Sequence, residues 1–354
     1  MKYIIASGTP FEIGLAHGTQ AREEVLVSLH TYKTLFNHYG GLTWEEAICR
    51  AKKFEAAIAA FDADFIEEMR GVAEGAGVKY EDILTLNVRS EILFAAPPAP
   101  EGCTAVAICP ERTAEHHMLH GQTWDWIPFQ EPAMCVIKII QRGKPNILML
   151  TEGGIIGKIG LNSCGMGVTL NAMSVPGSAA GGIPLHILLR AILNATGYVD
   201  AMKKCIKGHC ACAANIMLSL RDGEALDLEL VPGDYDVFYA EEGYMVHTNH
   251  LCSERLRAAY KDLNRESAPS THLRYGKADK IVRGAKEKFD AQKLWELFCD
   301  HNGYPDSICY HPDMLLSANV RGSTVATIVM DVTRLEMLAS VGRPCENPPT
   351  LYKL

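Results

Sequence analysis

Residues 95–109 read AAPPAPEGCTAVAIC, and the Gly102-Cys103 step within them separates two kinds of sequence. The half before this step cannot be helix or central strand, because proline lacks a backbone donor and fixes φ. The half after it is rich in small and β-branched residues, which predicts a strand that begins at Cys103. If the chain cut itself before Cys103, the new N-terminal thiol would be a nucleophile with its own α-amine as base. Most cysteines are small buried residues, so this dipeptide alone leaves both interpretations open.

The composition is that of an ordinary globular chain. Of its 354 residues, 48% are hydrophobic and 21% are charged, which is enough to form one large core or two smaller ones. The net charge of −8 favours neither nucleic acid nor an anionic membrane as a partner. No stretch approaches the length of a membrane span, and the N-terminus does not resemble a signal peptide. The 12 cysteines lack the spacing of a disulfide framework, so we expect reduced thiols in a cytoplasmic protein.

The first hundred residues are predicted to be mostly helical. Residues 10–37 and 43–75 carry apolar side chains at three-and-four spacing, with charges between them. Thr43 followed by Glu46 predicts a capping box at the start of the second region. One more short helix is expected around residues 80–86.

From Cys103 onward the pattern changes to short β-prone segments separated by turns, which predicts an antiparallel meander. A helical block is expected at 183–207 and further strands around 213–248. A polar connection at 250–290 then leads to a helix near 291–301, and the segments STVATIVMDV and RLEMLASVG form the last strands. Helices outside stacked antiparallel strands predict an α+β layered domain.

We expect no metal and no cofactor. The GHCAC segment, Gly208 to Cys212, lies near Cys205, but a second pair of closely spaced ligands, usual in structural zinc sites, does not accompany it. We therefore interpret it as a buried segment. The glycines of EGGIIGKIG, residues 152–160, fit neither a phosphate loop nor a dinucleotide fingerprint.

Polar side chains stand at the ends of several apolar, strand-like segments. Asp125 lies between two tryptophans, Asn171 and Asn249 each stand where a strand runs out, and Arg321 precedes the last strands. An asparagine amide can stabilise an oxyanion, a carboxylate can hold an N-terminal ammonium, and an arginine can lower a thiol pKa. Each residue alone also fits a structural interpretation, with asparagine as a turn former and the charged residues as an ion pair.

Nine blocks of sequence carry a resemblance to a known family. They are GTPFEIGLAHG (8–18), EEMRGVAEGAG (67–77), LNVRSE (86–91), EGCTA (101–105), GQTWDW (121–126), TEGGIIGKIGLNSCGMGV (151–168), MVHTNH (245–250), NGYPDSIC (302–309) and RGSTVATIVMD (321–331). The chain resembles the acyl-coenzyme A:6-aminopenicillanic acid acyltransferase (isopenicillin N acyltransferase-like) family, within the N-terminal nucleophile hydrolases. The resemblance implies a four-layer αββα sandwich that forms a single domain over residues 1–354.

The resemblance also implies a precursor that cleaves itself between Gly102 and Cys103. The products are an α subunit, residues 1–102, and a β subunit, residues 103–354, which stay associated as a heterodimer. Glycine suits the position before the cut, because attack by the Cys103 sulfur on the preceding carbonyl requires a kinked and uncrowded backbone.

Carried over residue by residue, the resemblance implies that Cys103 is the nucleophile of both self-cleavage and turnover, with its freed amine as base. Asp125 matches the family's aspartate near the nucleophile, Asn249 matches the oxyanion asparagine and Arg321 matches the site arginine. Asn171 matches, more loosely, an asparagine that lines the site in the related choloylglycine-hydrolase branch.

The chain departs from the penicillin-making enzyme at three positions near the substrate. Thr123 stands where that enzyme has asparagine, Tyr310 where it has arginine, and Val320 where it has serine. We therefore treat Thr123, Tyr310 and Asn171 as candidate substrate-binding residues, and these departures put penicillin synthesis and acyl-CoA use in doubt.

We expect an autoprocessed cysteine amidohydrolase or acyltransferase that acts on a small N-acyl amide or peptide through a thioester on Cys103. Its expected partners are a small amide or acyl donor and its own cleaved subunits, with no nucleic acid and no membrane. Two alternatives stay open. One is a choloylglycine-hydrolase-like or β-alanyl-amide hydrolase, and the other is a processed but catalytically idle protein that binds a small molecule.

Overall fold

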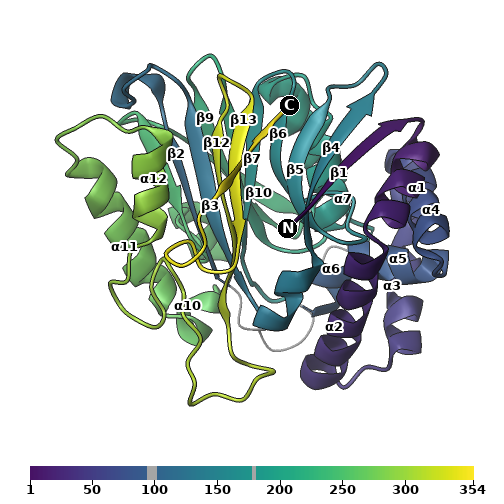
Figure 1. Ribbon diagram of the computed structural model, residues 1–354. Helices are drawn as coiled ribbons and strands as arrows, with labels where there is room; N and C mark the ends of the chain where they lie inside the picture. The colour runs from purple at the N-terminus through teal and green to yellow at the C-terminus, as the bar shows by residue number, and fades with distance from the viewer. Residues whose placement is uncertain (94–101, 178–180) are drawn as a thin grey trace.

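The computed structural model describes residues 1–93, 102–177 and 181–354, which form two β-sheets stacked between helices (Figure 1). The larger sheet has the strand order β1-β4-β5-β6-β7-β8-β9-β10, and the smaller one has the order β11-β2-β3-β12-β13-β14. The strands of the larger sheet are β1 (Lys2–Gly8), β4 (Met134–Gln141), β5 (Ile147–Glu152), β6 (Ile159–Asn162), β7 (Met166–Ala172), β8 (Ala214–Leu220), β9 (Ala225–Val231) and β10 (Asp234–Tyr239). Those of the smaller sheet are β2 (Gly102–Ile108), β3 (Leu119–Trp126), β11 (Tyr244–His247), β12 (Ser323–Asp331), β13 (Glu336–Val341) and β14 (Thr350–Lys353).

The predicted meander is present from β4 to β10, where each strand pairs antiparallel with the next along the chain. The first two predicted strands, β2 and β3, belong instead to the other sheet. Strand β1 pairs in parallel with β4 and β14 pairs with β13, and neither of these two edge strands was predicted.

The N-terminal helices are shorter than predicted. They are α1 (Pro10–Gln20), α2 (Arg22–Gly40), α3 (Trp44–Phe61), α4 (Asp64–Ala76), α5 (Tyr80–Asn87) and α6 (Arg89–Leu93). The capping box at the start of α3 is confirmed. The Thr43 N–H donates to Glu46 Oε2 at 2.8 Å, and the Glu46 N–H donates to Thr43 Oγ1 at 3.2 Å.

Helices α9 (Glu254–Ala259), α10 (Asn264–Ser267) and α11 (Ser270–Arg283) lie in the segment 250–290, which we predicted as a polar connection. The other later helices are α7 (Leu185–Leu193), α8 (Tyr198–Gly208) and α12 (Ala291–Phe298). Two short 3₁₀ turns lie at Pro110–Arg112 and Pro128–Ala133. Helices α11 and α12 pack on the smaller sheet, whereas α7 packs on β6 and β7 of the larger one.

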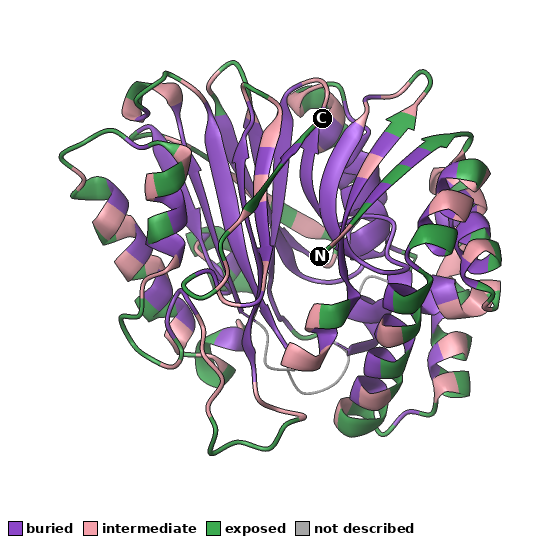
Figure 2. Cartoon of the chain, viewed as in Figure 1, coloured by how far each residue is buried: buried purple, intermediate pink, exposed green. Residues whose placement is uncertain are grey.

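The layers therefore run helix, sheet, sheet, helix, as the α+β four-layer prediction requires. The inner strands of both sheets are almost entirely buried, the edge strands β1, β10 and β14 are partly exposed, and most of the helices expose one face (Figure 2). Polar side chains also join the sheets, because Gln122 on β3 hydrogen-bonds both the N–H and the carbonyl of Leu170 on β7. In the described ranges, no helix is both long and apolar enough to cross a membrane.

Candidate active site

The Gly102-Cys103 step lies at the first residues of β2, in register with β3. Gly102 stands opposite Asp125, and Cys103 stands opposite Trp124. A Cβ atom added to Gly102 would lie 2.7 Å from Oδ2 of Asp125, which is closer than real Cβ atoms approach a neighbour. A side chain at this position would displace the carboxylate, and the fold brings the predicted aspartate against the predicted cleavage point.

Asn249 approaches the same dipeptide from the segment that follows β11, the strand beside β2. Its Oδ1 accepts a hydrogen bond from the Cys103 N–H at 2.8 Å, and its Nδ2 donates to the Ala172 carbonyl at 2.9 Å. These partners fix which way the amide faces, since a backbone N–H needs an acceptor. In this structure Asn249 therefore holds the Cys103 nitrogen.

Arg274 completes this group, and our sequence analysis missed it. From α11, its Nη1 donates to the Cys103 carbonyl at 2.6 Å and to Thr104 Oγ1 at 3.1 Å, while its Nη2 donates to Asn249 Oδ1 at 2.9 Å. A signal existed in the sequence. Thr271, Arg274, Ala278 and Val282 form the buried face of α11 at three-and-four spacing, and an arginine on such a face needs polar partners.

Asp125 is a buried carboxyl with partners for one of its two oxygens. Burial raises its pKa to about 6, although Arg274 and a hydrogen bond from Thr324 lower it in part. The Thr324 hydroxyl donates to Oδ1 at 2.6 Å, whereas Oδ2 has no hydrogen-bond partner in the described part of the chain. The oxygen that faces Gly102 is therefore the one available to a new partner.

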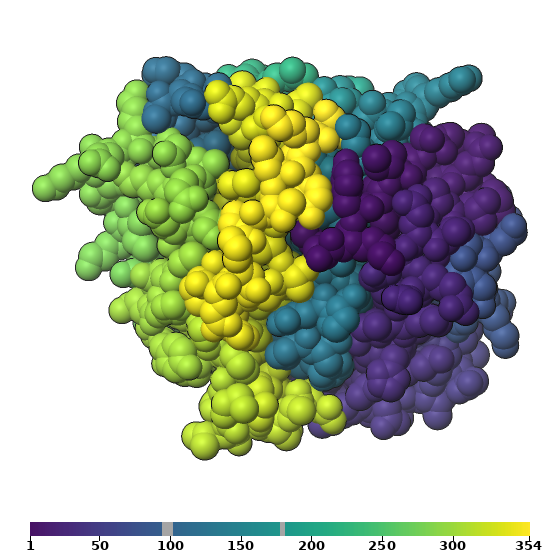
Figure 3. Space-filling model, in the orientation of Figure 1, coloured from purple at the N-terminus to yellow at the C-terminus, as the bar shows by residue number. Residues whose placement is uncertain are grey.

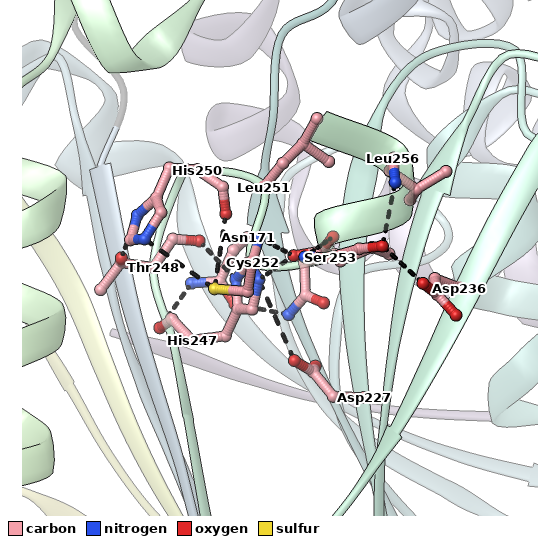
Figure 4. A network of polar contacts seen from close by, with 12 residues as sticks. Asn171, Asp227, Asp236, His247, Thr248, His250, Leu251, Cys252, Ser253 and Leu256 are labelled. Carbon is pink, nitrogen blue, oxygen red and sulfur yellow. Dashed lines mark hydrogen bonds and ion pairs between the residues drawn. The ribbon is translucent and has the colours of Figure 1, made fainter. Parts of the chain in front are cut away.

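A buried polar network supports the strand end that carries Asn249 (Figure 4). His247 Nε2 lies 2.9 Å from Glu229 Oε1. Burial alone would lower the His247 pKa, but the carboxylates around it, Asp227 foremost, raise it well above its usual value. Asn171 belongs to this network, because it donates to the His247 carbonyl at 3.4 Å and accepts from Asn215 at 3.3 Å. Its side chain thus supports the Asn249 segment.

A small enclosed cavity lies on the inner side of Cys103, between the sheets. It is lined by Cys103, Trp124, Arg89 and Lys158 among others. Lys158 lies 3.0 Å above the Trp124 ring and pairs with Glu152 at 2.6 Å. Burial lowers the Lys158 pKa to about 8, with Glu152 opposing the shift and Arg89 adding to it. Cys103 therefore has positively charged side chains on two sides, with Lys158 and Arg89 at the small cavity and Arg274 at its backbone carbonyl.

A larger cavity of about 330 Å³ opens on the other side of the dipeptide, which is a size suited to a small ligand. Gly102, Asp125, Ala172 and Arg274 line its inner end, and Tyr310 lines its wall. The side chains of Met173, Leu316 and Val320 make much of the remainder apolar. The cavity thus joins the predicted nucleophile region to an amphipathic space.

Two other predicted residues lie at the margin of this group. Thr123 is buried on β3, where its hydroxyl accepts the Thr104 N–H at 3.2 Å. Arg321 donates from Nε to the Asp313 carbonyl at 3.1 Å and from Nη2 to the Leu316 carbonyl at 2.7 Å. Arg321 therefore holds the loop that forms part of the cavity wall, and the arginine hydrogen-bonded to Cys103 is Arg274.

Comparison with known proteins agrees with the resemblance. The family model "Acyl-coenzyme A:6-aminopenicillanic acid acyl-transferase" matches residues 112–345. A relative from Emericella nidulans, the 40 kDa form of acyl-coenzyme A:6-aminopenicillanic-acid-acyltransferase, is 33% identical over 99% of this chain and 95% of its own length. The chain belongs to this family. The family model begins after Cys103, whereas the match to the relative covers nearly the whole chain.

Among solved structures, this family member is similar to a mutant conjugated bile acid hydrolase from Clostridium perfringens and to a penicillin V acylase from Agrobacterium tumefaciens. The first is 13% identical, covers 71% of this chain and 97% of that chain, and has a TM-score of 0.47. The second is 13% identical, covers 68% of this chain and 83% of that chain, and has a TM-score of 0.45.

Proposed function

We propose that the chain is an autoprocessed cysteine amidohydrolase or acyltransferase that acts on a small N-acyl amide or peptide through a thioester on Cys103. Membership of the acyltransferase family supports chemistry at an acyl group. The observation that carries the proposal is that three polar side chains contact the Gly102-Cys103 dipeptide. Asn249 binds the Cys103 N–H, Arg274 binds the Cys103 carbonyl, and Asp125 packs against Gly102.

In the proposed self-cleavage, the Cys103 sulfur attacks the Gly102 carbonyl carbon. A C–S bond forms, the C–N bond breaks, and the Cys103 nitrogen takes the proton given up by the thiol. Water then hydrolyses the thioester, which leaves a carboxylate on Gly102 and a free thiol and α-amine on Cys103. Asn249 Oδ1, which accepts from the amide N–H in the uncut chain, is placed to accept from that amine.

In the proposed turnover, the α-amine of Cys103 takes the thiol proton and the sulfur attacks the substrate carbonyl. The Asn249 amide has two N–H groups, one of which donates to Ala172, and we assign the second to the oxyanion together with a backbone N–H. The amine then protonates the leaving group, and water or an acceptor amine takes the acyl group from sulfur.

We propose Asp125 as the partner of the Cys103 ammonium, through its Oδ2. A carboxylate with an unsatisfied buried oxygen gains most from a charged donor. Arg274 takes the role of keeping the Cys103 thiolate in a positive environment. Arg321 and Tyr310 then act on the substrate through the cavity wall, while Thr123 and Asn171 hold the strand ends around it.

Intact-mass spectrometry of the purified wild type and of Cys103→Ala tests this proposal. The wild type is expected as two fragments, 1–102 and 103–354, and Cys103→Ala as one full-length chain. Cys109→Ala is the matched control, because Cys109 is a buried cysteine directly after the same strand and its variant should be cut normally. A cut Cys103→Ala chain would contradict the proposal.

A panel of small N-acyl amides, including bile-acid and β-alanyl amides, then tests turnover. Hydrolysis or acyl transfer by the wild type and not by Cys103→Ala supports the proposed enzyme, and the preferred amide decides the substrate class. Binding of these compounds by a processed protein, without any turnover, would favour the catalytically idle alternative.

A further inference from the structure

Two histidines and two cysteines meet where the loop after α12 lies beside the C-terminal segment. Figure 3 shows this C-terminal segment in yellow, next to the yellow-green part of the chain that precedes it. His301 follows α12, Cys309 and His311 belong to the loop before β12, and Cys345 follows β13. Each side chain contributes one ligand atom, and these four atoms all lie within 4.8 Å of one another.

The distances from each sulfur to the other sulfur and to His311 are those between the ligands of a metal ion, whereas the two histidine nitrogens lie closer together. The two sulfurs of Cys309 and Cys345 are 3.5 Å apart, and they lie 3.6 Å and 3.5 Å from Nε2 of His311. Nε2 of His311 lies 3.0 Å from Nε2 of His301. A tetrahedral zinc ion, with bonds of about 2.3 Å to sulfur and about 2.0 Å to nitrogen, separates its ligands by roughly 3.3–3.8 Å.

Hydrogen bonds alone give this cluster little stability. Thiols are weak donors and weak acceptors, and two facing imidazole nitrogens can share only one hydrogen between them. The sulfurs are also well beyond the S–S bond length of about 2.05 Å. A soft divalent cation, in contrast, accepts a lone pair from all four atoms, and a tetrahedral set of two sulfurs and two nitrogens is typical of zinc.

We propose that His301, Cys309, His311 and Cys345 bind one zinc ion. Four protein ligands fill a tetrahedral site, so the ion has a structural role and no open position for substrate. Binding requires both thiols as thiolates, so two protons pass to solvent and the ion with its two sulfurs is neutral overall.

The surroundings of the cluster suit an ion that enters from solvent. His301 and Cys345 are exposed and His311 is partly so, whereas Cys309 is buried and anchors the inner side. Ligating histidines usually face a carboxylate or carbonyl with their second nitrogen. Nδ1 of His311 faces Oε1 of Glu346 at 3.9 Å, which is beyond hydrogen-bond distance, and the other oxygen of Glu346 binds Arg343 at 2.6 Å.

The ion would fix one wall of the large cavity. Tyr310 lies between two of the ligands and lines that cavity. Its N–H donates to Thr324 Oγ1 at 2.9 Å, and the Thr324 hydroxyl in turn donates to Asp125. The proposed zinc therefore clamps the Cys309–His311 segment to the C-terminal segment, two hydrogen bonds away from the candidate active site.

Zinc content is measured on the full chain, purified without a histidine tag and in a reducing buffer. Elemental analysis is expected to give about one zinc per chain, and His301→Ala and Cys345→Ser should each lose most of it. Both substitutions are at exposed positions, so folding is expected to survive them. Cys49→Ser, which changes an exposed cysteine on α3, is the matched control and should keep the ion.

A second measurement needs no variant. Removing the ion from the wild type with a chelator should lower its melting temperature by several degrees, and Zn²⁺ but not Mg²⁺ should restore it. Native mass spectrometry should show the mass of one zinc minus two protons. Wild type that takes up no zinc, or a chain lighter by two hydrogens through a Cys309–Cys345 disulfide, would overturn the proposal.

The proposal does not depend on the proposed enzymatic function. The uncut Cys103→Ala chain carries the same four ligands and should bind the same amount of zinc. Failure of self-cleavage would therefore leave the zinc result intact, and absence of zinc would leave the mass-spectrometric test of cleavage intact.

Discussion

Arg274 gives the candidate site its geometry at the scale of single residues. Its planar guanidinium donates to the Cys103 carbonyl and to Asn249 Oδ1. Cys103 and Asn249 are also joined to each other, by the hydrogen bond from the Cys103 N–H to Asn249 Oδ1, so Arg274 holds both partners of that bond. Lysine offers a point charge in place of this fork and cannot reproduce it. We regard Arg274 as a positioning residue for self-cleavage.

Replacing Arg274 should therefore slow processing. We expect Arg274→Met to lower the rate of cleavage at least about tenfold, because the Cys103 carbonyl loses a charged hydrogen bond of roughly 1.5–3 kcal/mol. Arg274→Lys should recover only part of the rate. The rate is measured as the appearance of the 103–354 fragment by mass spectrometry, with Arg283→Met, an exposed arginine on the same helix, as the control. Equal rates for Arg274→Met and wild type would remove this role.

The buried carboxyl of Asp125 makes a second prediction, on the pH dependence of stability. Its pKa in the folded chain is about 6, above its unfolded value, so the folded state holds the proton more tightly. Stability from the neutral carboxyl is thus lost as the pH rises through the folded pKa. An asparagine side chain cannot ionise, so Asp125→Asn should stabilise the chain more at pH 8 than at pH 5, by about 1.5 kcal/mol.

The comparison is made by urea unfolding in the uncut Cys103→Ala background, so that both chains have the same covalent structure. Asp222→Asn, which changes an exposed aspartate in the turn between β8 and β9, serves as the control. An effect of Asp125→Asn that does not change between pH 5 and pH 8 would mean that the carboxyl keeps an ordinary pKa in the folded chain.

Part of the candidate site could be predicted from the sequence. Cys103, Asp125 and Asn249 are chemically conspicuous, because each is a reactive or polar residue at the end of an apolar strand, and the fold brings all three together. Arg274 was missed because its segment is rich in charge and we interpreted it as a connection. Arg321 was predicted from the family resemblance. Its observed contacts are to carbonyl groups of a loop, and no local sequence pattern reveals the path of that loop.

At the scale of elements, the tightest packing joins α1 and α4 through paired glycines. A Cβ on Gly14 would lie 1.9 Å from the Glu68 carbonyl oxygen, and one on Gly71 would lie 2.1 Å from the Phe11 oxygen. Gly18 and Gly75, each four residues further along its helix, make equally close approaches. The two backbones are thus in direct contact along one face, which only glycine permits.

Gly71→Ala should therefore destabilise the protein, although alanine is the better helix former by about 1 kcal/mol. Overpacking against a backbone atom cannot be relieved by a side-chain rotation, so we expect a net loss of at least about 2 kcal/mol. Gly276→Ala is the control. Gly276 lies within α11 with open space around it, so the same substitution should be neutral or stabilising. Thermal or urea unfolding distinguishes the two, and similar small effects would contradict the packing argument.

Most elements could be predicted because their periodicity is local. The capping box at Thr43 and the strand at Cys103 are confirmed. The break between α3 and α4 at residues 62–63 was missed, since apolar spacing continues through it. Strand β1 was missed for a different reason: it is an edge strand with several exposed apolar residues, and its parallel partner β4 lies far along the chain.

At the scale of the whole molecule, the proposed cut divides a fold whose two parts are interleaved. Strand β1, from the first part, pairs along its full length with β4, from the second. Buried contacts add to this pairing. Arg89 binds Glu152 at 3.1 Å, and Glu91 accepts the Leu185 N–H at 2.8 Å. A buried ion pair that loses one partner leaves an uncompensated charge, so separation is costly.

The two fragments should therefore stay together after cleavage. In native size-exclusion chromatography we expect 1–102 and 103–354 to elute at the volume of the uncut Cys103→Ala chain, and to separate only in denaturant. Weakening the contacts between the two fragments should make them separate more easily. Glu152→Gln removes the negative charge shared by Arg89 and Lys158, and it should lower the denaturant concentration at which the processed fragments separate. In the uncut chain the same substitution destabilises but cannot release a fragment, which separates loss of association from loss of folding. Release of the 1–102 fragment from the wild type in native buffer would contradict the interleaved arrangement.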